Sequence, residues 1–466
     1  MTGEQRRITL AVCVIAGLSL LVVAGLTFLV TPMSEDLGLD DGEVEDILVI
    51  PSVASLLVIF IAGQAGDRLG HRKTIIISGA GFTLGALILA AAPGAVAVDV
   101  GLALCGGMAV ALQIVGLGLL QQTVPEGKAR VSAFTSYGMV FPLGFLILPV
   151  ATAGLLEAAN WRFIPIIWTL SGLAICTVAF TLLRPSESTR PMGEWVTPLL
   201  AGLTLTAAAR SLVETSHDSP DSPTVIIGVL VSITAAIGCA LTMRHSTRST
   251  FTLEPLRSGL LRSLLVGVGI VSLVGMLTYV TIALEYLYAL TSLAAAIALI
   301  SAQGGAVFGA KFLAAWAMHR WGVSLAARRL MIAIAITMLP LLAMQSSTPA
   351  WYLIASAAVF SCMGMAALTV LNAEVMGHAP HGSTGAVSSF RAAASSIGGS
   401  LGVAILGTAI ISAVRVDDGV GAVSPAQLDQ LAAGLRLDAV LACVIATIGW
   451  VVLTRAERRY KEVTPT

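Results

Sequence analysis

Long apolar runs make up most of the chain, and short polar or turn-forming clusters separate them. Each run holds about 20 residues or more, which is what an α-helix needs to cross a hydrocarbon layer about 30 Å thick. The pattern therefore predicts an all-α polytopic membrane protein. The fourteen predicted transmembrane helices cover residues 8–31, 44–65, 74–92, 97–121, 131–156, 162–183, 195–213, 223–243, 262–287, 292–318, 325–345, 350–373, 384–413 and 434–454.

Basic residues indicate which loops face the cytoplasm, because short cytoplasmic loops are rich in Lys and Arg. With the amino terminus inside, 20 of the 26 basic residues fall on the cytoplasmic side. An odd number of spans would destroy this sorting, so both termini are predicted to be cytoplasmic. Run 8–31 has no small-residue cleavage site after it, and we expect it to remain as the first span.

Composition narrows the class of protein further. Hydrophobic residues make up 56% of the chain and charged residues only 11%, which excludes a soluble enzyme. The net charge is zero, so nucleic-acid binding is not expected. Arg far outnumbers Lys and Ala and Gly are abundant, which is typical of a GC-rich bacterial genome, and we expect a bacterial inner membrane.

No cofactor is predicted. The six cysteines lie in different apolar runs without the spacing of a metal site, and we interpret them as small packing residues. No G-x-x-x-x-G-K-[ST] loop is present, so direct use of ATP is not expected. No nucleophile, base and orienting group occur together on a soluble surface, and no catalysis is predicted.

The most specific motif lies between the second and third predicted spans, where residues 63–73 read GQAGDRLGHRK. Glycines there permit a tight turn and close helix approach, and a carboxylate flanked by arginines can form charge-assisted pairs at a membrane edge. The alternative is an ordinary positively charged cytoplasmic loop. The residues that carry the motif are Gly63, Asp67, Arg68, Gly70 and Arg72.

This segment resembles the G-x-L-a-D-R-x-G-R-[RK] loop motif of the major facilitator superfamily, with Ala65 where Leu is usual. The resemblance implies that Asp67 latches two halves of a transporter on the cytoplasmic side. A degenerate copy, AWAMHRWG at residues 315–322, follows the tenth span with His319 in place of the acid. Related halves of this kind are typical of transporters built from repeated bundles.

Further segments are similar to the fourteen-span drug–proton antiporters of bacterial multidrug efflux. Trp161 and Arg162 match a W-R pair, and residues 398–404 match a G-G-x-x-G-x-A run in which Gly398 and Gly402 form a face for close helix packing. The implied organisation is a six-helix bundle over 1–184, a linker with two inserted helices over 185–258, and a second six-helix bundle over 259–466 with a short cytoplasmic tail.

The groups expected to couple protons depart from this family. Val23 stands where the first span of the family carries Asp, and Phe28 where it carries Asn. Ionisable residues within spans are functional candidates, and Asp46 and Glu285 are therefore the candidate proton-coupling residues. If both face a cavity, desolvation favours their protonated forms; the alternative is that both are interfacial residues at water-exposed helix ends.

Lys311 and Arg391 lie deeper in their spans. Lys311 either extends to the cytoplasmic interface or lines the cavity, and Arg391 serves an anionic headgroup or a carboxylate such as Glu374. Mid-span polar groups, including Gln113, Ser136, Tyr137 and Gln303, contact the substrate or form hydrogen bonds between helices. The candidate substrate-cavity residues are Phe28, Gln113, Tyr137, Tyr279, Gln303, Lys311 and Arg391.

A mostly apolar cavity favours a hydrophobic or amphipathic cargo over a sugar or amino acid. We therefore predict a monomeric secondary transporter that exports such molecules by alternating access, coupled to proton antiport. Its partners would be the lipid bilayer, a hydrophobic small molecule or lipid, and protons. Two alternatives stay open: an exporter or flippase of an endogenous lipid or metabolite without conventional proton coupling, and a non-transporting scaffold or sensor.

Overall fold

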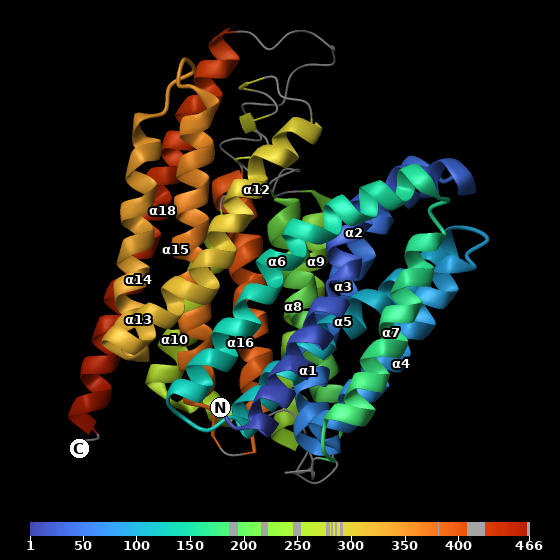
Figure 1. The fold of residues 1–466 in the computed structure, drawn as a ribbon, viewed down its shortest axis with the longest axis horizontal. Coiled ribbons are helices and arrows are strands. Elements are labelled where there is room, and N and C mark those ends of the chain that lie inside the picture. The colour runs from blue at the N-terminus through green and yellow to red at the C-terminus, as the bar shows by residue number, and fades with distance from the viewer. Residues whose placement is uncertain are drawn as a thin grey trace. The chain divides into compact units, whose positions relative to one another are not determined.

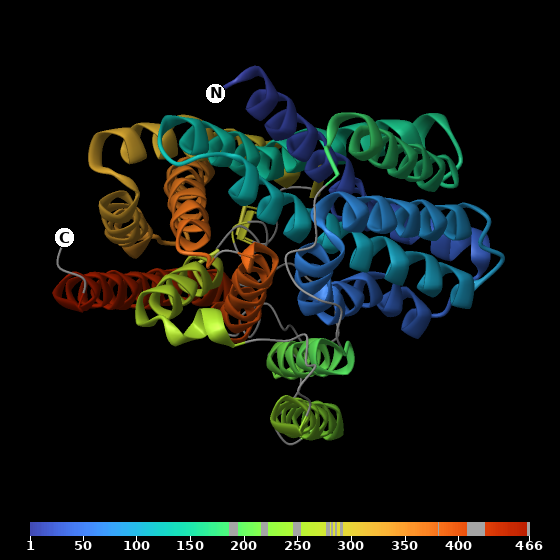
Figure 2. The ribbon, with the colours of Figure 1, turned by 90° about the horizontal axis from the view of Figure 1, so that it is seen from below.

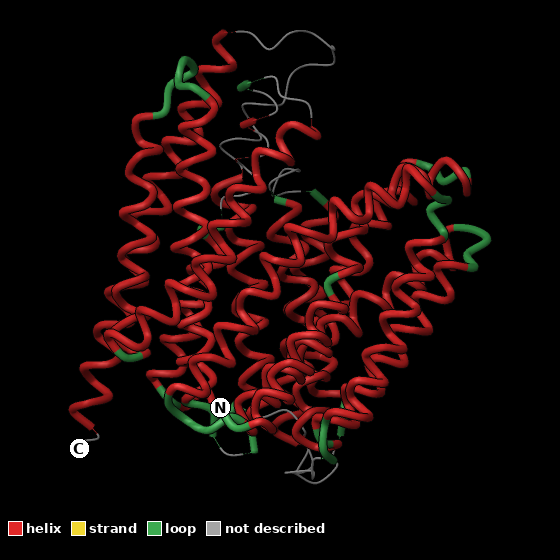
Figure 3. The backbone as a smooth tube through the Cα atoms, in the orientation of Figure 1, coloured by secondary structure: helices red, strands yellow, loops and turns green. Residues whose placement is uncertain are grey.

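The computed structural model describes residues 1–185, 194–215, 222–245, 253–275, 280, 283–284, 287–288, 292–380, 382–407 and 425–463. Figure 3 shows helices joined by short loops. Within these residues, 13 helices are long and apolar enough to cross a membrane. The all-α polytopic fold is confirmed. The predicted span 262–287 begins as the 15-residue helix Gly259–Leu273 and runs into residues outside the described part, so the count of fourteen stays a prediction.

The chain divides into two compact units. The first, called unit 1, comprises Met1–Ala207, Val231–Pro255 and Met376–Ala393. The second, unit 2, comprises Ala208–Leu230, Leu256–Val375 and Ala394–Thr466. The helices α8 (Val196–Glu214), α9 (Pro223–His245), α15 (Ala350–Gly377) and α16 (Thr384–Gly402) contribute to both units. The division at 184/185 and 258/259 stays a prediction.

Unit 1 is built around α5, which packs against α3 and α4, while α4 also packs against α7 (Figures 1 and 2). Buried aromatic and aliphatic side chains such as Phe82, Leu102 and Trp168 fill the space between these helices. The helices wholly within this unit are α1 (Gly3–Ser19), α2 (Leu21–Leu37), α3 (Asp41–Leu69), α4 (His71–Ala90), α5 (Ala95–Thr123), α6 (Lys128–Ala158) and α7 (Phe163–Leu182).

Unit 2 is built around α18, the helix Pro425–Val463, which packs against α10 and α14. Figure 1 shows α14, α15 and α18 in this unit as long helices. Its other elements are η1 (Glu254–Arg257, whose Glu254 and Pro255 belong to unit 1), α10 (Gly259–Leu273), α12 (Ser292–Phe308), the π-helical turn η2 (Gly309–Leu313), α13 (Ala314–Trp321), α14 (Val323–Met338), the 3-10 turn η3 (Leu339–Ala343) and the π-helical turn η4 (Val403–Gly407).

The two copies of the loop motif share a backbone conformation. Gly70 joins α3 to α4 with φ 88° and ψ 141°, and Gly322 joins α13 to α14 with φ 77° and ψ 162°. Both dihedral pairs lie in a region that glycine adopts without steric cost. The predicted repeat at residues 315–322 therefore keeps the turn of the first motif although His319 replaces its acid.

Small residues bring helix backbones into direct contact, as predicted for Gly398 and Gly402. A Cβ atom on Gly398 would overlap the backbone of Gly269 in α10, and one on Gly402 would overlap Leu273. Lipid tails are as apolar as leucine, so helices in a membrane associate through such close packing rather than through a hydrophobic drive. Gly399, one residue along, differs: a Cβ atom there would meet no heavy atom within 4 Å.

Gly398→Val should destabilise the protein by about 1–3 kcal/mol, because the added side chain forces α16 away from α10. The measurement is the thermal unfolding temperature of the purified protein in detergent. Gly399→Val is the matched control, since it imposes the same change in helix propensity at an open position. Equal unfolding temperatures for the two variants would contradict close packing at Gly398.

Candidate functional site

Asp67 of the loop motif binds the start of α16. Its side chain is 2% exposed, and its Oδ1 and Oδ2 atoms accept hydrogen bonds from the backbone N–H groups of Gly385 at 2.9 Å and Ala386 at 3.0 Å. The first N–H groups of a helix have no partner within the helix and carry partial positive charge. A carboxylate there forms two charge-assisted hydrogen bonds, which are stronger than neutral ones. We call this contact between α3 and α16 the latch.

Two glycines allow the latch to form. A Cβ atom on Gly63 would overlap the carbonyl oxygen of Gly385, and a Cβ on Gly385 would overlap the carbonyl oxygen of Gly63. The backbones of α3 and α16 therefore touch directly one helical turn before Asp67. This explains why the motif requires glycine at position 63: any side chain would lift α16 away from the carboxylate.

Side chains on the first half of α16 extend the latch along α3 and α5. Ser389 Oγ donates a hydrogen bond to the carbonyl of Ile59 at 2.7 Å, and Ser388 Oγ donates to that of Ile114 at 3.0 Å. The ring of Phe390 packs edge-on against Phe60 with centroids 5.6 Å apart. These contacts hold one face of α16 over about two turns.

The arginines of the motif lie on either side of the Gly70 turn. Arg68 is buried near the end of α3. Arg72 donates to the carbonyls of Ala179 at 3.2 Å and Phe180 at 2.7 Å, in the last turn of α7. Carbonyls at a helix end lack partners within the helix, and a cation near them is favourable. Asp67 and Arg72 of the predicted motif therefore both bind helix ends.

Three of the predicted cavity residues come together in unit 1. Tyr137 Oη on α6 donates to the carbonyl of Gln113 on α5 at 3.1 Å, and Gln113 Nε2 donates to Ser19 Oγ on α1 at 3.4 Å. Arg391 on α16 lies near enough to Tyr137 for a direct electrostatic interaction. We call Ser19, Gln113, Tyr137 and Arg391 the polar cluster. It places hydrogen-bonding groups and one cation among apolar helices.

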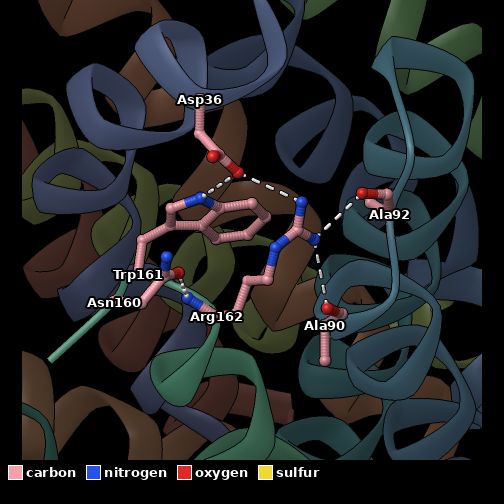
Figure 4. Close-up of polar contacts among 6 residues, drawn as sticks. All are labelled: Asp36, Ala90, Ala92, Asn160, Trp161 and Arg162. Atoms are coloured by element: carbon pink, nitrogen blue, oxygen red, sulfur yellow. Dashed lines mark hydrogen bonds and ion pairs between the residues drawn. The ribbon is translucent and has the colours of Figure 1, made fainter.

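A second group of polar contacts joins the end of α2 to the start of α7 (Figure 4). Asp36 Oδ2 accepts from Trp161 Nε1 at 3.0 Å and from Arg162 Nη2 at 3.1 Å. Arg162 Nη1 also donates to the carbonyls of Ala90 and Ala92, at 3.3 Å and 2.9 Å, where α4 ends. The W-R pair thus ties three helix ends together.

An open pocket of about 390 Å³ adjoins this group. Its lining residues are Pro32, Glu35, Asp36, Leu156, Ala159, Asn160 and Trp161. Two carboxyl groups line the pocket, but Asp36 is already used by Trp161 and Arg162. The sequence does not distinguish Asp36, because it lies in a predicted loop rich in Asp and Glu, and water usually solvates the side chains of such a loop. Its contact with Trp161 and Arg162 sets Asp36 apart from the other acids, and this contact is visible only in the folded structure.

The remaining predicted residues are dispersed. Asp46 is exposed in the second turn of α3 and interacts electrostatically with Asp99. Phe28 is partly exposed on α2. Gln303 on α12 and Lys311 in η2 are both half-buried and belong to unit 2. Tyr279 and Glu285 lie outside the described residues.

Comparison with known proteins identifies a family and several relatives. The family model described as Major Facilitator Superfamily matches residues 12–403. The "Multidrug efflux pump LfrA" of Mycolicibacterium smegmatis is 25% identical over 373 residues, 76% of this chain and 70% of that protein. The "Puromycin resistance protein pur8" of Streptomyces alboniger is 24% identical over 422 residues, 87% of this chain and 82% of that protein.

A third relative and two solved structures are also similar to the chain. The "Tetracenomycin C resistance and export protein" of Streptomyces glaucescens is 25% identical over 382 residues, 78% of this chain and 68% of that protein. Among solved structures, the human organic anion transporter MFSD10 superposes with a TM-score of 0.66 at 15% identity, over 97% of this chain and 100% of that chain. The proton:xylose symporter XylE gives a TM-score of 0.60 at 13% identity, with 94% of each chain covered. These structures share the fold.

Asp67→Asn should lower the stability of the protein by about 1–3 kcal/mol, because the amide has no charge and its NH2 group faces one of the two N–H donors. Thermal unfolding in detergent measures the change. Glu126→Gln is the control: Glu126 pairs with Arg130 at 3.1 Å but is 82% exposed, and an exposed pair contributes about 0–1 kcal/mol. Asp67→Asn unfolding at the wild-type temperature would show that the latch does not stabilise this state.

Proposed function

Because the chain belongs to the Major Facilitator Superfamily, we propose that it is a secondary transporter that exports hydrophobic or amphipathic small molecules by alternating access, with proton antiport. The observation that carries the proposal is the latch, supported by the relatives whose names state multidrug efflux, drug resistance or export. The proposed location is a bacterial cytoplasmic membrane, with both termini on the cytoplasmic side and a monomer as the working form.

The latch supports alternating access because it is strong yet reversible. Asp67 accepts two hydrogen bonds from the first turn of α16, while the second half of the same helix packs against α10 through Gly398 and Gly402. When the first turn of α16 separates from α3, water reaches both the carboxylate and the freed N–H groups and replaces the lost bonds. The net cost of opening is therefore modest, which a cycling transporter requires.

The polar cluster supports an amphipathic cargo. Ser19, Gln113 and Tyr137 offer a few directional groups, and Arg391 adds one cation, in a unit that also has a large apolar core. A binding site of this kind holds a mostly apolar molecule and orients it by one or two polar contacts. A sugar would need many more convergent hydrogen-bonding groups.

The position of Val23 favours a second candidate function. Val23 occupies the place of the family's first-span Asp, so no carboxyl group is available there to exchange protons. An exporter or flippase of an endogenous lipid or metabolite, moving its cargo without conventional proton coupling, accounts for this departure. Asp46 and Glu285 stay the proposed coupling residues of the first candidate.

Cells that express the chain should accumulate less of a fluorescent hydrophobic cation than cells with an empty vector, because the proposed cargo class includes such dyes. A protonophore should restore accumulation, and Asp67→Asn should reduce export at least tenfold at equal expression. Glu126→Gln serves as the control. Unchanged accumulation in well-expressed protein would remove such dyes from the substrates, and export that survives the protonophore would favour the uncoupled candidate.

Tyr137→Phe should raise the KM for dye export about two- to tenfold, because it removes one hydroxyl worth roughly 0.5–1.5 kcal/mol as a hydrogen bond. The maximal rate should stay near that of the wild type. Tyr352→Phe is the matched control, since Tyr352 Oη donates to the Pro340 carbonyl at 2.7 Å in unit 2. The same KM for Tyr137→Phe and the wild type would exclude the phenol from substrate binding.

A further inference from the structure

A carboxyl group outside the latch and the polar cluster lies buried in the span of α18. Asp438 is 0% exposed, and among the described residues neither of its oxygens has a hydrogen-bond partner. Asp438 falls within the predicted span 434–454. The sequence pattern does not distinguish it there, because it lies four residues from the predicted end of the span and near Arg436. In the structure, Asp438 belongs to the helical stretch Leu428–Tyr460, which is long and apolar enough to cross a membrane.

Asp438 lies between the two ends of a long apolar helix. Asp438 is ten residues, or about 15 Å, from Leu428 at one end of the span, and 17 residues, or about 25 Å, from Arg455 near the other. The hydrocarbon core is about 30 Å thick. Asp438 therefore lies within the apolar stretch of α18, and its complete burial shows that neighbouring side chains enclose it.

The same face of α18 is apolar on both sides of Asp438. Leu431, Leu435, Ala442 and Ala446 are buried at helical spacing around it. The helix packs against α10, α14 and η3. One contact sets the register of α18 against α14: Cys443 Sγ donates to the Ala335 carbonyl at 3.2 Å, five residues from Asp438.

The charged side chains on the helices that pack against α18 are either exposed or interact with other residues. On α14, Arg328 pairs with Glu457 at 2.8 Å, and Glu457 is 19 residues, about 28 Å, along α18 from Asp438. Arg329 stacks on Trp321 at 4.6 Å. On α10, Arg262 is exposed near the first turn, and η3 has no titratable residue.

The other charged residues of α18 lie on another face of the helix or near its ends. Arg436 is exposed on another face of the helix. Asp429 accepts a hydrogen bond from Ser346 Oγ at 2.5 Å near the start of the helix, and the basic residues from Arg455 onward lie at its opposite end. No described cation on α10, α14, η3 or α18 therefore compensates an ionised Asp438.

A carboxylate without a hydrogen-bond donor in an apolar interior is much less stable than the neutral acid, because burial removes the water that solvates its charge. In this state of the protein the neutral acid is the stable form. Any rearrangement that brings water or a donor to Asp438 reverses the preference, because the ion is then solvated. The protonation of Asp438 is thus tied to the packing of α18.

We propose that Asp438 is a proton-carrying residue of the transport cycle. In the state described here it holds a proton on one carboxyl oxygen. When α18 repacks and water from the cytoplasmic side reaches the group, the O–H bond breaks and the proton passes to that water. The carboxylate takes its next proton from water on the outer side, so one proton enters per cycle. This inference rests on the proposed antiport function.

The test uses the full chain in proteoliposomes with an imposed pH gradient and a hydrophobic cationic dye. Asp438→Asn should lose gradient-driven dye accumulation at least tenfold, while dye exchange without a gradient stays within about twofold of the wild type. Asp429→Asn is the matched control on the same helix and should keep both activities. Asp438→Glu, which retains a titratable group, should keep gradient-driven accumulation with a shifted pH profile.

Gradient-driven accumulation that persists in Asp438→Asn would overturn the proposal, as would loss of dye exchange in a folded variant, which would make Asp438 a substrate or structural residue. If Asp438→Asn does not fold, Asp438→Glu decides: an unshifted pH profile overturns the proposal. Both variants are checked by thermal unfolding and size exclusion before reconstitution.

Infrared spectroscopy tests the protonation state independently of transport. Wild-type protein at pH 7 should show the carbonyl absorption of a protonated carboxylic acid, and Asp438→Asn should lose that band while Asp429→Asn keeps it. Absence of the band in the wild type would overturn the proposal. If the proposed export function itself is wrong, the wild type shows no gradient-driven transport, yet the infrared comparison still reports on Asp438.

Discussion

A hydrocarbon solvent supplies no hydrogen bonds, so every backbone polar group within the membrane must be satisfied inside a helix, and only helix ends keep free N–H and C=O groups. The charged residues of unit 1 are placed accordingly. Asp67 accepts from the first amides of α16, Arg72 donates to the last carbonyls of α7, and Arg162 donates to carbonyls at the end of α4. Each charge has the sign that the helix dipole favours at that end. The loop motif and the W-R pair therefore do the same thing: each places a charged side chain against the free backbone groups at a helix end.

Close backbone contact is the second consequence of the same solvent. Because apolar side chains gain little by leaving lipid, helices gain from close packing and from polar contacts that small residues make accessible. Gly63 and Gly385 bring α3 and α16 together in unit 1, and Gly269 and Gly398 do the same for α10 and α16 in unit 2. Contacts of this kind fit in one register only. A helix held by them moves between discrete positions rather than sliding continuously, which suits a transporter with two access states.

The sequence predicts the helices well and their partners poorly, for a physical reason. Hydrophobic length reflects the solvent, which acts on each span separately, so 13 of the predicted spans are found among the described residues. The partner of Asp67 lies 318 residues away in the chain, and no local pattern encodes it. Tyr137 and Gln113 could be named as polar residues in mid-span, but their hydrogen bond depends on how α5 and α6 pack. Asp36 is one of several loop acids in the sequence, and only the fold brings it to Arg162.

The proposed proton coupling does not depend on an acid in the first span, where Val23 stands. What a proton carrier needs is an environment that changes between states, not a fixed place in the chain. With valine at position 23, the first span carries no carboxyl group that could bind a proton. Asp438 is fully buried on a helix that packs against α10 and α14, and α10 also carries the close glycine contacts with α16. A buried acid at that point has its proton affinity set by helix packing, which is the coupling that antiport requires.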